Sequence, residues 1–388
     1  MRNIEKIVYF DNAATTFPKP EEVYAFMDKF YREFGVNVGR GQHKQAAQAA
    51  SIVSETRELL LNLFHAPDRK IVFTHTATEA LNTILMGLPI CDGYTIYLTP
   101  FEHNSVTRLI TFLSNIYNLN IQTLAFDKNR YTYNIEKIKL QFTEKRPNIV
   151  LMSHASNSFG VIAPVTEICA LSKPYDAINI VDMCQTAGLI DLDLSNEMID
   201  YAVFAGHKTL YGPLGISGFV CFANTKLKPF IYGGTGIDSL NQQMPDTVPE
   251  RFEAGSPNIQ AISGLHAALC WLHKTSISLV LKKEKEHHQK LLDVLTNFDN
   301  IFVYPPIGTE NCIGVVSCVF DGYSSDNIGK VLNNENIAVR TGLHCAPYAH
   351  NFIGTAPGGT VRFSVGYFND DDDFERLYEA LSYIYDNA

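Results

Sequence analysis

The feature that most constrains the fold of this chain is a repeated alternation of short apolar runs with helical patterns between about residues 70 and 225. The apolar runs, which are typical of buried strands, lie at residues 70–74, 94–99, 148–153, 178–183, 201–206 and 218–222. Amphipathic helical patterns lie between them, most clearly at 78–88 and 104–116. Strands that alternate with helices predict crossover connections and a mostly parallel sheet with both faces covered. We therefore predict an α/β fold.

The length of the chain and a change of pattern near residue 260 predict two domains. A chain of 388 residues exceeds what one hydrophobic core normally serves. Residues 231–260 are rich in Gly, Pro and polar residues, and 263–298 resemble a long, interrupted amphipathic helix. Strand and helix patterns are then mixed up to the C-terminus. We expect a large domain at 15–260 and a smaller α+β domain formed by 1–14 and 261–388.

Charge and composition disfavour nucleic-acid and membrane partners. The chain has 31 Lys and Arg against 41 Asp and Glu, a formal net charge of −10 that is spread along the sequence. Nucleic-acid surfaces need clustered basic residues. The sequence contains no run of about 18 apolar residues and starts without a long apolar region, so we expect a cytoplasmic protein. Its eight cysteines lack a CxxC pair, which predicts free thiols and no metal site.

Polar residues repeatedly follow the predicted strands. In open α/β sheets, ligands bind beyond the carboxyl ends of the strands, so these residues predict one shared site. They include Thr76, Thr78, His103, Asn157, Asp182, Gln185, His207 and Lys208.

Lys208 and Asp182 are the most informative pair in this set. A lysine between a buried strand and a glycine-rich turn can lose solvent, which frees its amine for imine formation. A carboxylate at the end of a neighbouring strand can hold a pyridine nitrogen protonated. Taken singly, Lys208 also fits a solvated loop lysine and Asp182 a helix N-cap. Their combination favours a pyridoxal-phosphate site.

The ordered motifs of the chain resemble the fold-type I pyridoxal-phosphate enzymes of the class V aminotransferase family, and within it the cysteine desulfurases and selenocysteine lyases. The resemblance runs from Tyr9 nearly to the C-terminus and implies a large sheet domain with a smaller C-terminal domain. It rests on YFDNAATT, TATEALN, EHNS, SNSFG, DMCQTAG, GHKTLYGPLG, RFEAGSPN, RTGLHCA and VRFSVGYFN.

The resemblance implies a role for each residue around the cofactor. Lys208 resembles the Schiff-base lysine, while Asp182 and Gln185 resemble the partners of the ring nitrogen and the ring oxygen. His103 resembles a catalytic residue that stacks on the ring. Small residues that open a helix offer N–H groups to a phosphate, which indicates Ala77 and Thr78, with His207 as a further contact. Ser256 resembles a residue that reaches the phosphate across a dimer interface, which implies a homodimer.

A second set of residues resembles the sulfur-transfer and substrate machinery of the desulfurases. Cys345 lies on a polar loop between strands and matches the cysteine that accepts sulfur as a persulfide. His344 either helps to ionise this thiol or points outward, and Leu343 stands where many desulfurases carry another histidine. The residues that resemble substrate contacts are Asn157, Arg340, Arg362 and His43.

The resemblance thus implies a pyridoxal-phosphate-dependent cysteine desulfurase that converts L-cysteine to L-alanine and leaves a persulfide on Cys345. A sulfur-acceptor protein is an expected partner. Alternative activities in the same family are selenocysteine lysis, transamination, β-elimination and epimerisation. The alternative outside enzymes is a cofactor-binding scaffold that carries sulfur.

Overall fold

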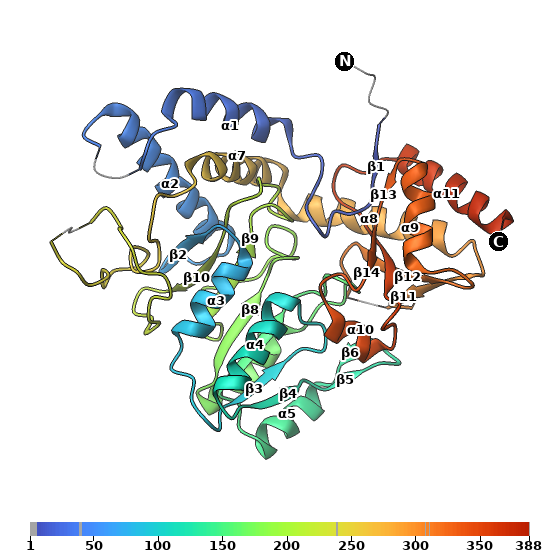
Figure 1. Ribbon diagram of the computed structural model, residues 1–388, viewed down its shortest axis with the longest axis horizontal. Coiled ribbons are helices and arrows are strands. Elements are labelled where there is room, and N and C mark those ends of the chain that lie inside the picture. Colours follow the sequence, from blue (N-terminus) through green and yellow to red (C-terminus); the bar gives the residue numbers. More distant parts are fainter. Residues whose placement is uncertain (1–5, 39–40, 238–239, 307, 310, 388) are drawn as a thin grey trace.

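The computed structural model describes residues 6–38, 41–237, 240–306, 308–309 and 311–387, and its centre is a seven-stranded sheet (Figure 1). The strands of the sheet from β9 to β4 are mutually parallel, which confirms the predicted α/β fold. The sequence patterns did not predict β4, because all its residues are only half-buried. Across the sheet the order is β2 (Arg69–Thr74), β10 (Ser217–Phe222), β9 (Tyr201–Ala205), β8 (Ile178–Asp182), β7 (Ile149–Ser153), β3 (Thr95–Leu98) and β4 (Asn120–Thr123).

Strand β10 departs from the parallel arrangement and runs antiparallel to both β2 and β9. The chain has only residues 206–216 between β9 and β10, whereas a parallel crossover needs about a dozen residues or more. The connection therefore turns back at the carboxyl end of β9. Lys208 lies on this turn.

Helices cover both faces of the sheet and bury two separate core clusters. Alternate residues of β7 contribute to the two clusters, Val150 to one and Leu151 to the other, as the period of a strand requires. One face packs against α1 (Glu21–Phe34), α2 (Lys44–Leu63), α5 (Ile135–Glu144), α6 (Val165–Ser172) and α7 (Ile259–Thr275), and the other against α3 (Ala77–Gly87) and α4 (Asn104–Ile116). In the described part of the chain, no helix has the length and apolar character of a membrane span.

The C-terminal part forms a second sheet of four antiparallel strands. Its strand order is β11 (Ile301–Tyr304), β12 (Val315–Phe320), β15 (Thr360–Ser364) and β14 (Arg340–Gly342). Its helices are α8 (Ile277–Leu295), α9 (Ser325–Asn334), α10 (Pro347–Ile353) and α11 (Asp371–Asp386). Other short elements are β5 (Phe126–Asp127), β6 (Thr132–Tyr133) and the 3-10 turn η1 (Lys173–Tyr175).

The long helical pattern after residue 260 is divided into α7 and α8 at Ser276, whose φ is 71°. Helix α7 packs in the same core cluster as the large sheet, and Leu291 and Leu295 of α8 pack in the cluster of the small one. The change of direction at Ser276 thus leads the chain from one core to the other. The boundary at 260/261 stays a prediction.

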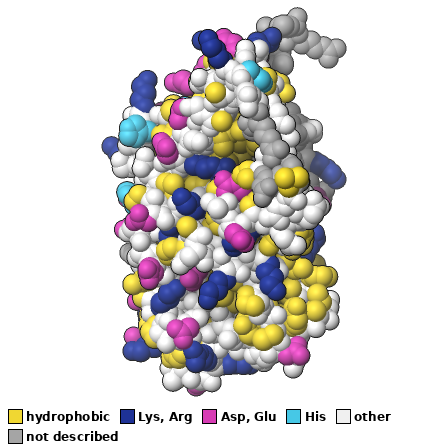
Figure 2. Space-filling model, turned by 90° about the vertical axis from the view of Figure 1, so that its left-hand side faces the viewer, with side chains coloured by type: hydrophobic (Ala, Val, Ile, Leu, Met, Phe, Trp, Pro, Cys, Tyr) yellow, Lys and Arg dark blue, Asp and Glu magenta, His cyan; other side chains and the backbone are white. Residues whose placement is uncertain are grey.

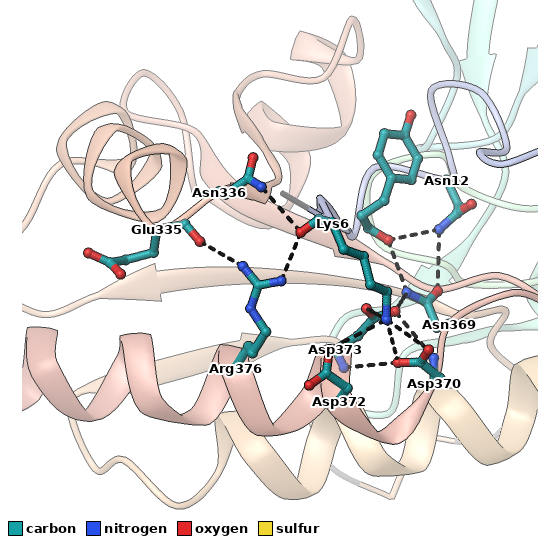
Figure 3. Close-up of polar contacts among 10 residues, drawn as sticks. Lys6, Asn12, Glu335, Asn336, Asn369, Asp370, Asp372, Asp373 and Arg376 are labelled. Carbon is teal, nitrogen blue, oxygen red and sulfur yellow. Dashed lines mark hydrogen bonds and ion pairs between the residues drawn. The ribbon is translucent and has the colours of Figure 1, made fainter. Parts of the chain in front are cut away.

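The N-terminal segment lies against the C-terminal part of the chain. Strand β1 (Val8–Tyr9) pairs in parallel with β13 (Ile337–Ala338). The Lys6 amine lies 2.8 Å from a carboxylate oxygen of Asp370 and 3.2 Å from one of Asp373, at the start of α11 (Figure 3). Arg376 donates to the carbonyl oxygen of Lys6 at 2.8 Å. These contacts place the chain so that the residues after β1 run toward the large sheet.

Candidate active site

The predicted strand-end residues meet in one cavity of about 280 Å³ at the carboxyl ends of the large sheet. Besides these strand ends, the cavity wall includes Arg340 and Arg362 of the small sheet. Residues from sequence-distant segments therefore converge on one space between the two sheets. The predicted site residues that line it are Ala77, Thr78, His103, Asn157, Asp182, Gln185, His207, Lys208, Arg340 and Arg362.

Lys208 enters the cavity from the turn between β9 and β10. The turn is tight, since Tyr211 N donates to Lys208 O at 2.8 Å and Tyr211 has a φ of 58°. In the described part of the chain, no hydrogen bond or ion pair reaches the side-chain amine of Lys208. The amine is thus available to a ligand.

Asp182 and Gln185 follow β8 and are both buried. Asp182 Oδ1 accepts a hydrogen bond from Cys184 N at 2.9 Å, so this carboxylate also caps the local turn. Gln185 Nε2 donates to Ala13 O at 3.0 Å, which connects the N-terminal segment to the cavity wall. An amide nitrogen carries two hydrogens, so Gln185 keeps one donor for a ligand.

Helices α3 and α4 both begin at the cavity. Thr76 caps α3 by accepting from Glu79 N at 3.1 Å, and Ala77 and Thr78 form the first turn, whose N–H groups favour anions. His103 caps α4, and its Nδ1 accepts from Ser105 N at 3.0 Å. Burial lowers the pKa of His103 to about 4, so the ring is neutral at pH 7 and presents a polarisable face.

Arg362 is almost fully buried on β15 and is fixed on two sides. Its Nη1 donates to Asn157 O at 2.9 Å and its Nη2 pairs with Asp11 Oδ1 at 2.5 Å. Two nearby polar atoms, Arg362 Nε and Asn157 Oδ1, are buried and have no partner within the described residues. Buried polar groups are normally hydrogen-bonded, so these two atoms indicate a place for a polar ligand.

Cys345 lies beside the cavity but does not line it, and its side chain is only half-buried. Arg340 Nη2 donates to Cys345 Sγ at 3.3 Å. Arg340 itself lines the cavity. The structure therefore connects the thiol to the cavity through Arg340.

The loop that carries Cys345 has an unusual backbone. His344 and Cys345 have φ values of 48° and 57°, a left-handed conformation that costs non-glycine residues roughly 1–3 kcal/mol each. Two hydrogen bonds to the large sheet hold the loop: Asn104 N to Cys345 O and Asn157 Nδ2 to His344 O, both at 2.7 Å. The strain is thus balanced by contacts from the other side of the cavity.

His344 does not point outward, which was one of the two alternatives that the sequence left open. Its ring is buried, and Nε2 lies 2.8 Å from Thr360 Oγ1. Burial lowers the pKa of His344 to about 2, so the ring carries no positive charge near pH 7. A role of His344 in ionising the Cys345 thiol stays a prediction, while Arg340 is the cation that contacts the sulfur.

Besides Cys345, two predicted site residues lie outside the cavity wall. His43 is exposed and caps α2, with Nδ1 accepting from Ala46 N at 3.2 Å. Ser256 is also exposed, and Asn37 Nδ2 donates to its hydroxyl at 3.3 Å. Within one copy of the chain, neither side chain reaches Lys208, so their predicted roles stay predictions.

Several residues that the sequence did not single out complete the site. Ser105 orients His103, and Asp11 holds Arg362. Ala13 both lines the cavity and accepts from Gln185. The signal for Asp11 and Ala13 was present in the YFDNAATT motif, but no property of that segment indicated which strand it meets.

The charges around the cavity suit an anionic ligand. The lining residues in the described chain include three cations, Lys208, Arg340 and Arg362, against one carboxylate, Asp182. Burial lowers the pKa of His207 to about 3, so this ring is neutral and its partnerless, buried Nδ1 remains open to a ligand. The first turn of α3 and His207 would hold the phosphate of a bound pyridoxal phosphate, and His103 and Asp182 would contact its ring. The residues therefore fit pyridoxal phosphate.

Comparisons with known proteins agree over nearly the whole chain. The family model for class-V aminotransferases matches residues 8–377. A probable cysteine desulfurase of Pyrococcus abyssi is 31% identical, with 97% of this chain and 94% of that protein covered. A probable cysteine desulfurase of Mycobacterium leprae is also 31% identical, with coverage of 98% and 92%. The apo structure of a cysteine desulfurase from Thermococcus onnurineus superposes with a TM-score of 0.91 at 28% identity, covering 98% and 95%.

Proposed function

Since this chain belongs to the class-V aminotransferase family, we propose that it is a pyridoxal-phosphate-dependent cysteine desulfurase. The observation that carries the proposal is the joint presence of Lys208 in the cavity and the Arg340–Cys345 pair at its edge. An amine and a nucleophilic thiol at one site match what sulfur abstraction requires. The similar proteins named above support the same reaction.

The residues that would hold the cofactor are those of the sheet edge. Lys208 would bind it covalently, Asp182 and Gln185 would contact its ring, His103 would cover the ring, and the start of α3 would hold the phosphate. Bound in this way, the cofactor withdraws electrons from the substrate's α-carbon. This electron withdrawal is the chemistry that no side chain of the protein supplies.

The chain's own residues perform the remaining steps. Arg362 Nε and Asn157 Oδ1 face the site as partnerless polar atoms, and they would orient the carboxylate and the amine of L-cysteine. The side-chain amine of Lys208 would take up the α-proton of the substrate. Cys345 Sγ would form a bond to the substrate sulfur as the C–S bond of the substrate breaks, and the electron pair of that bond would stay with the β-carbon, which takes up a proton in place of the sulfur. The products are L-alanine and a persulfide on Cys345, so sulfur and protons balance without an added oxidant or reductant.

Mass spectrometry of Cys345 after incubation with L-cysteine tests the proposal directly. We expect one additional sulfur atom on the peptide that contains Cys345, together with one alanine for each persulfide in a single turnover. Release of free sulfide with an unmodified Cys345 would instead support β-elimination. Formation of a keto acid that keeps the sulfur, without release of sulfide, would support transamination.

We also propose that the active form is a homodimer. Ser256 does not line the cavity of its own chain. This position suits a residue that contacts the phosphate in the cavity of a second copy of the chain. The connection that precedes it exposes large apolar side chains, and Figure 2 shows groups of hydrophobic side chains on the face where this connection lies. The strongly exposed side chains near it are Leu214, Phe230, Ile231, Tyr232, Ile237 and Leu240.

A reducing compartment and a protein partner complete the proposal. The described residues include all eight cysteines and none of them forms a disulfide, which suits the cytoplasm. The half-buried Cys345 can pass its sulfur to a thiol of an acceptor protein. Selenocysteine as substrate is distinguished by formation of alanine and elemental selenium from L-selenocysteine in a Cys345→Ser variant, because selenium leaves more readily than sulfur.

A further inference from the structure

The carbonyl oxygen of His207, directly before Lys208 in the chain, is surrounded by hydrogen-bond donors from the N-terminal segment. It accepts from Lys19 Nζ at 2.6 Å, from Thr15 Oγ1 at 2.9 Å and from Thr16 N at 3.2 Å. Thr16 Oγ1 also donates to the next carbonyl, Lys208 O, at 3.1 Å. A carbonyl oxygen has two lone pairs and can accept more than one hydrogen bond. These donors therefore hold the peptide group between His207 and Lys208 more firmly than a single hydrogen bond would.

Lys19 is the unusual member of this group. Its half-buried amine also donates to Thr16 Oγ1 at 2.7 Å and to Thr15 Oγ1 at 3.4 Å, so its partners are neutral oxygens. In the described part of the chain, no carboxylate lies within ion-pair distance of Lys19. Lys6, by contrast, lies among three carboxylates of the α11 start. Burial lowers the pKa of Lys19 to about 7, whereas the oxygen acceptors favour its charged form.

A half-buried amine without a counter-ion costs stability, and a neutral side chain would pack there at lower cost. The position of this amine on the peptide that leads into Lys208 offers a reason for its presence. Nearby charged groups do not replace it, since His207 is neutral and Lys208 points into the cavity.

We propose that Lys19 is a positioning residue for Lys208. Its hydrogen bond to the carbonyl oxygen of His207 fixes the turn so that the Lys208 amine faces the cavity. The inference rests on the proposed function, because it concerns the lysine that would bind the cofactor. Lys19 itself does not line the cavity and touches neither cofactor nor substrate. Its effect passes through the backbone.

The test measures how fast Lys208 captures pyridoxal phosphate. Purified protein freed of cofactor is mixed with saturating pyridoxal phosphate, samples are reduced with borohydride at timed intervals, and labelled Lys208 is counted by mass spectrometry. Losing the hydrogen bond from Lys19 to the carbonyl of His207 should slow capture in Lys19→Met about tenfold. Lys19→Arg, which keeps a charged donor, should recover most of the rate. Lys29→Met, an exposed lysine of α1, is the matched control and should react like wild type.

A urea unfolding curve of each cofactor-free variant separates positioning from folding. The inference requires slower capture at saturating cofactor with an unfolding midpoint near that of wild type. Capture by Lys19→Met at the wild-type rate would overturn it, as would a rate loss that Lys19→Arg does not recover. Should Lys19→Met fail to fold, Thr15→Val removes another donor to His207 O, and an unchanged rate in that variant would equally overturn it. If wild type itself never labels Lys208, the proposed function fails rather than the role of Lys19.

Discussion

The two reactive side chains of the site are held in different ways. Lys208 projects from a turn at the end of a buried strand of the large sheet, and the N-terminal segment fixes the backbone before it. Cys345 projects from a strained loop of the small sheet that hydrogen bonds hold against the opposite wall. The amine thus lies on a turn whose backbone the N-terminal segment fixes, while the position of the thiol depends on hydrogen bonds across the cavity. The two halves of the site should therefore respond differently to substitution.

Removing the amine should produce the largest effect. Lys208→Ala should abolish the yellow absorbance of the bound cofactor and reduce alanine formation at least about a thousandfold, because the covalent link and the proton carrier are lost together. Absorbance spectra and alanine assays measure both. The exposed Lys226→Ala, just beyond β10, should change neither. Persistent yellow colour in Lys208→Ala would show that another lysine binds the cofactor.

Removing the thiol should abolish sulfur transfer but leave cofactor binding intact. Cys345→Ser should keep the cofactor absorbance of wild type but form no alanine from L-cysteine above background, since a hydroxyl cannot accept the sulfur. The same assays apply, with the exposed Cys91→Ser as control. Normal alanine release by Cys345→Ser would remove Cys345 from the mechanism.

Removing the cation next to the thiol should have an intermediate effect. Arg340→Met deletes the donor at 3.3 Å from Cys345 Sγ, so alkylation of Cys345 by iodoacetamide at pH 7 should slow about tenfold. Mass spectrometry of the Cys345 peptide gives the rate. Arg108→Met, an exposed arginine of α4, serves as control. An unchanged rate would mean that the loop backbone alone sets the reactivity of the thiol.

Removing the hydrogen bond that holds the ring of His344, next to Cys345, should have the smallest effect. Thr360 Oγ1 bonds both His344 and Ser317, and Thr360→Val should cost about 1–3 kcal/mol of unfolding free energy. Persulfide formation should fall a few-fold while cofactor binding stays unchanged. Urea unfolding and the persulfide assay measure these effects, with the exposed Thr132→Val for comparison. A loss of cofactor absorbance would contradict the independence of the two halves.

The sequence was most informative where function depends on strand ends. Lys208, Asp182 and Gln185 follow apolar runs, and parallel strands bring their carboxyl ends to one edge, so their meeting in the cavity was predictable. His344 shows the opposite case. Its place next to Cys345 on a loop suggested an exposed side chain or a role shared with the thiol, but the ring is buried and lies 2.8 Å from Thr360 Oγ1.

The sequence by itself determined the alternation of strands and helices, the family and the identity of the lysine at the sheet edge, because these depend on local periodicity and ordered motifs. Only the tertiary structure decided three contacts of the site. Arg340 donates to Cys345, Asp11 pairs with Arg362, and Lys19 donates to the carbonyl oxygen of the residue before Lys208. The latter two contacts join residues far apart in the chain, and such pairings follow from how the two sheets and the N-terminal segment pack.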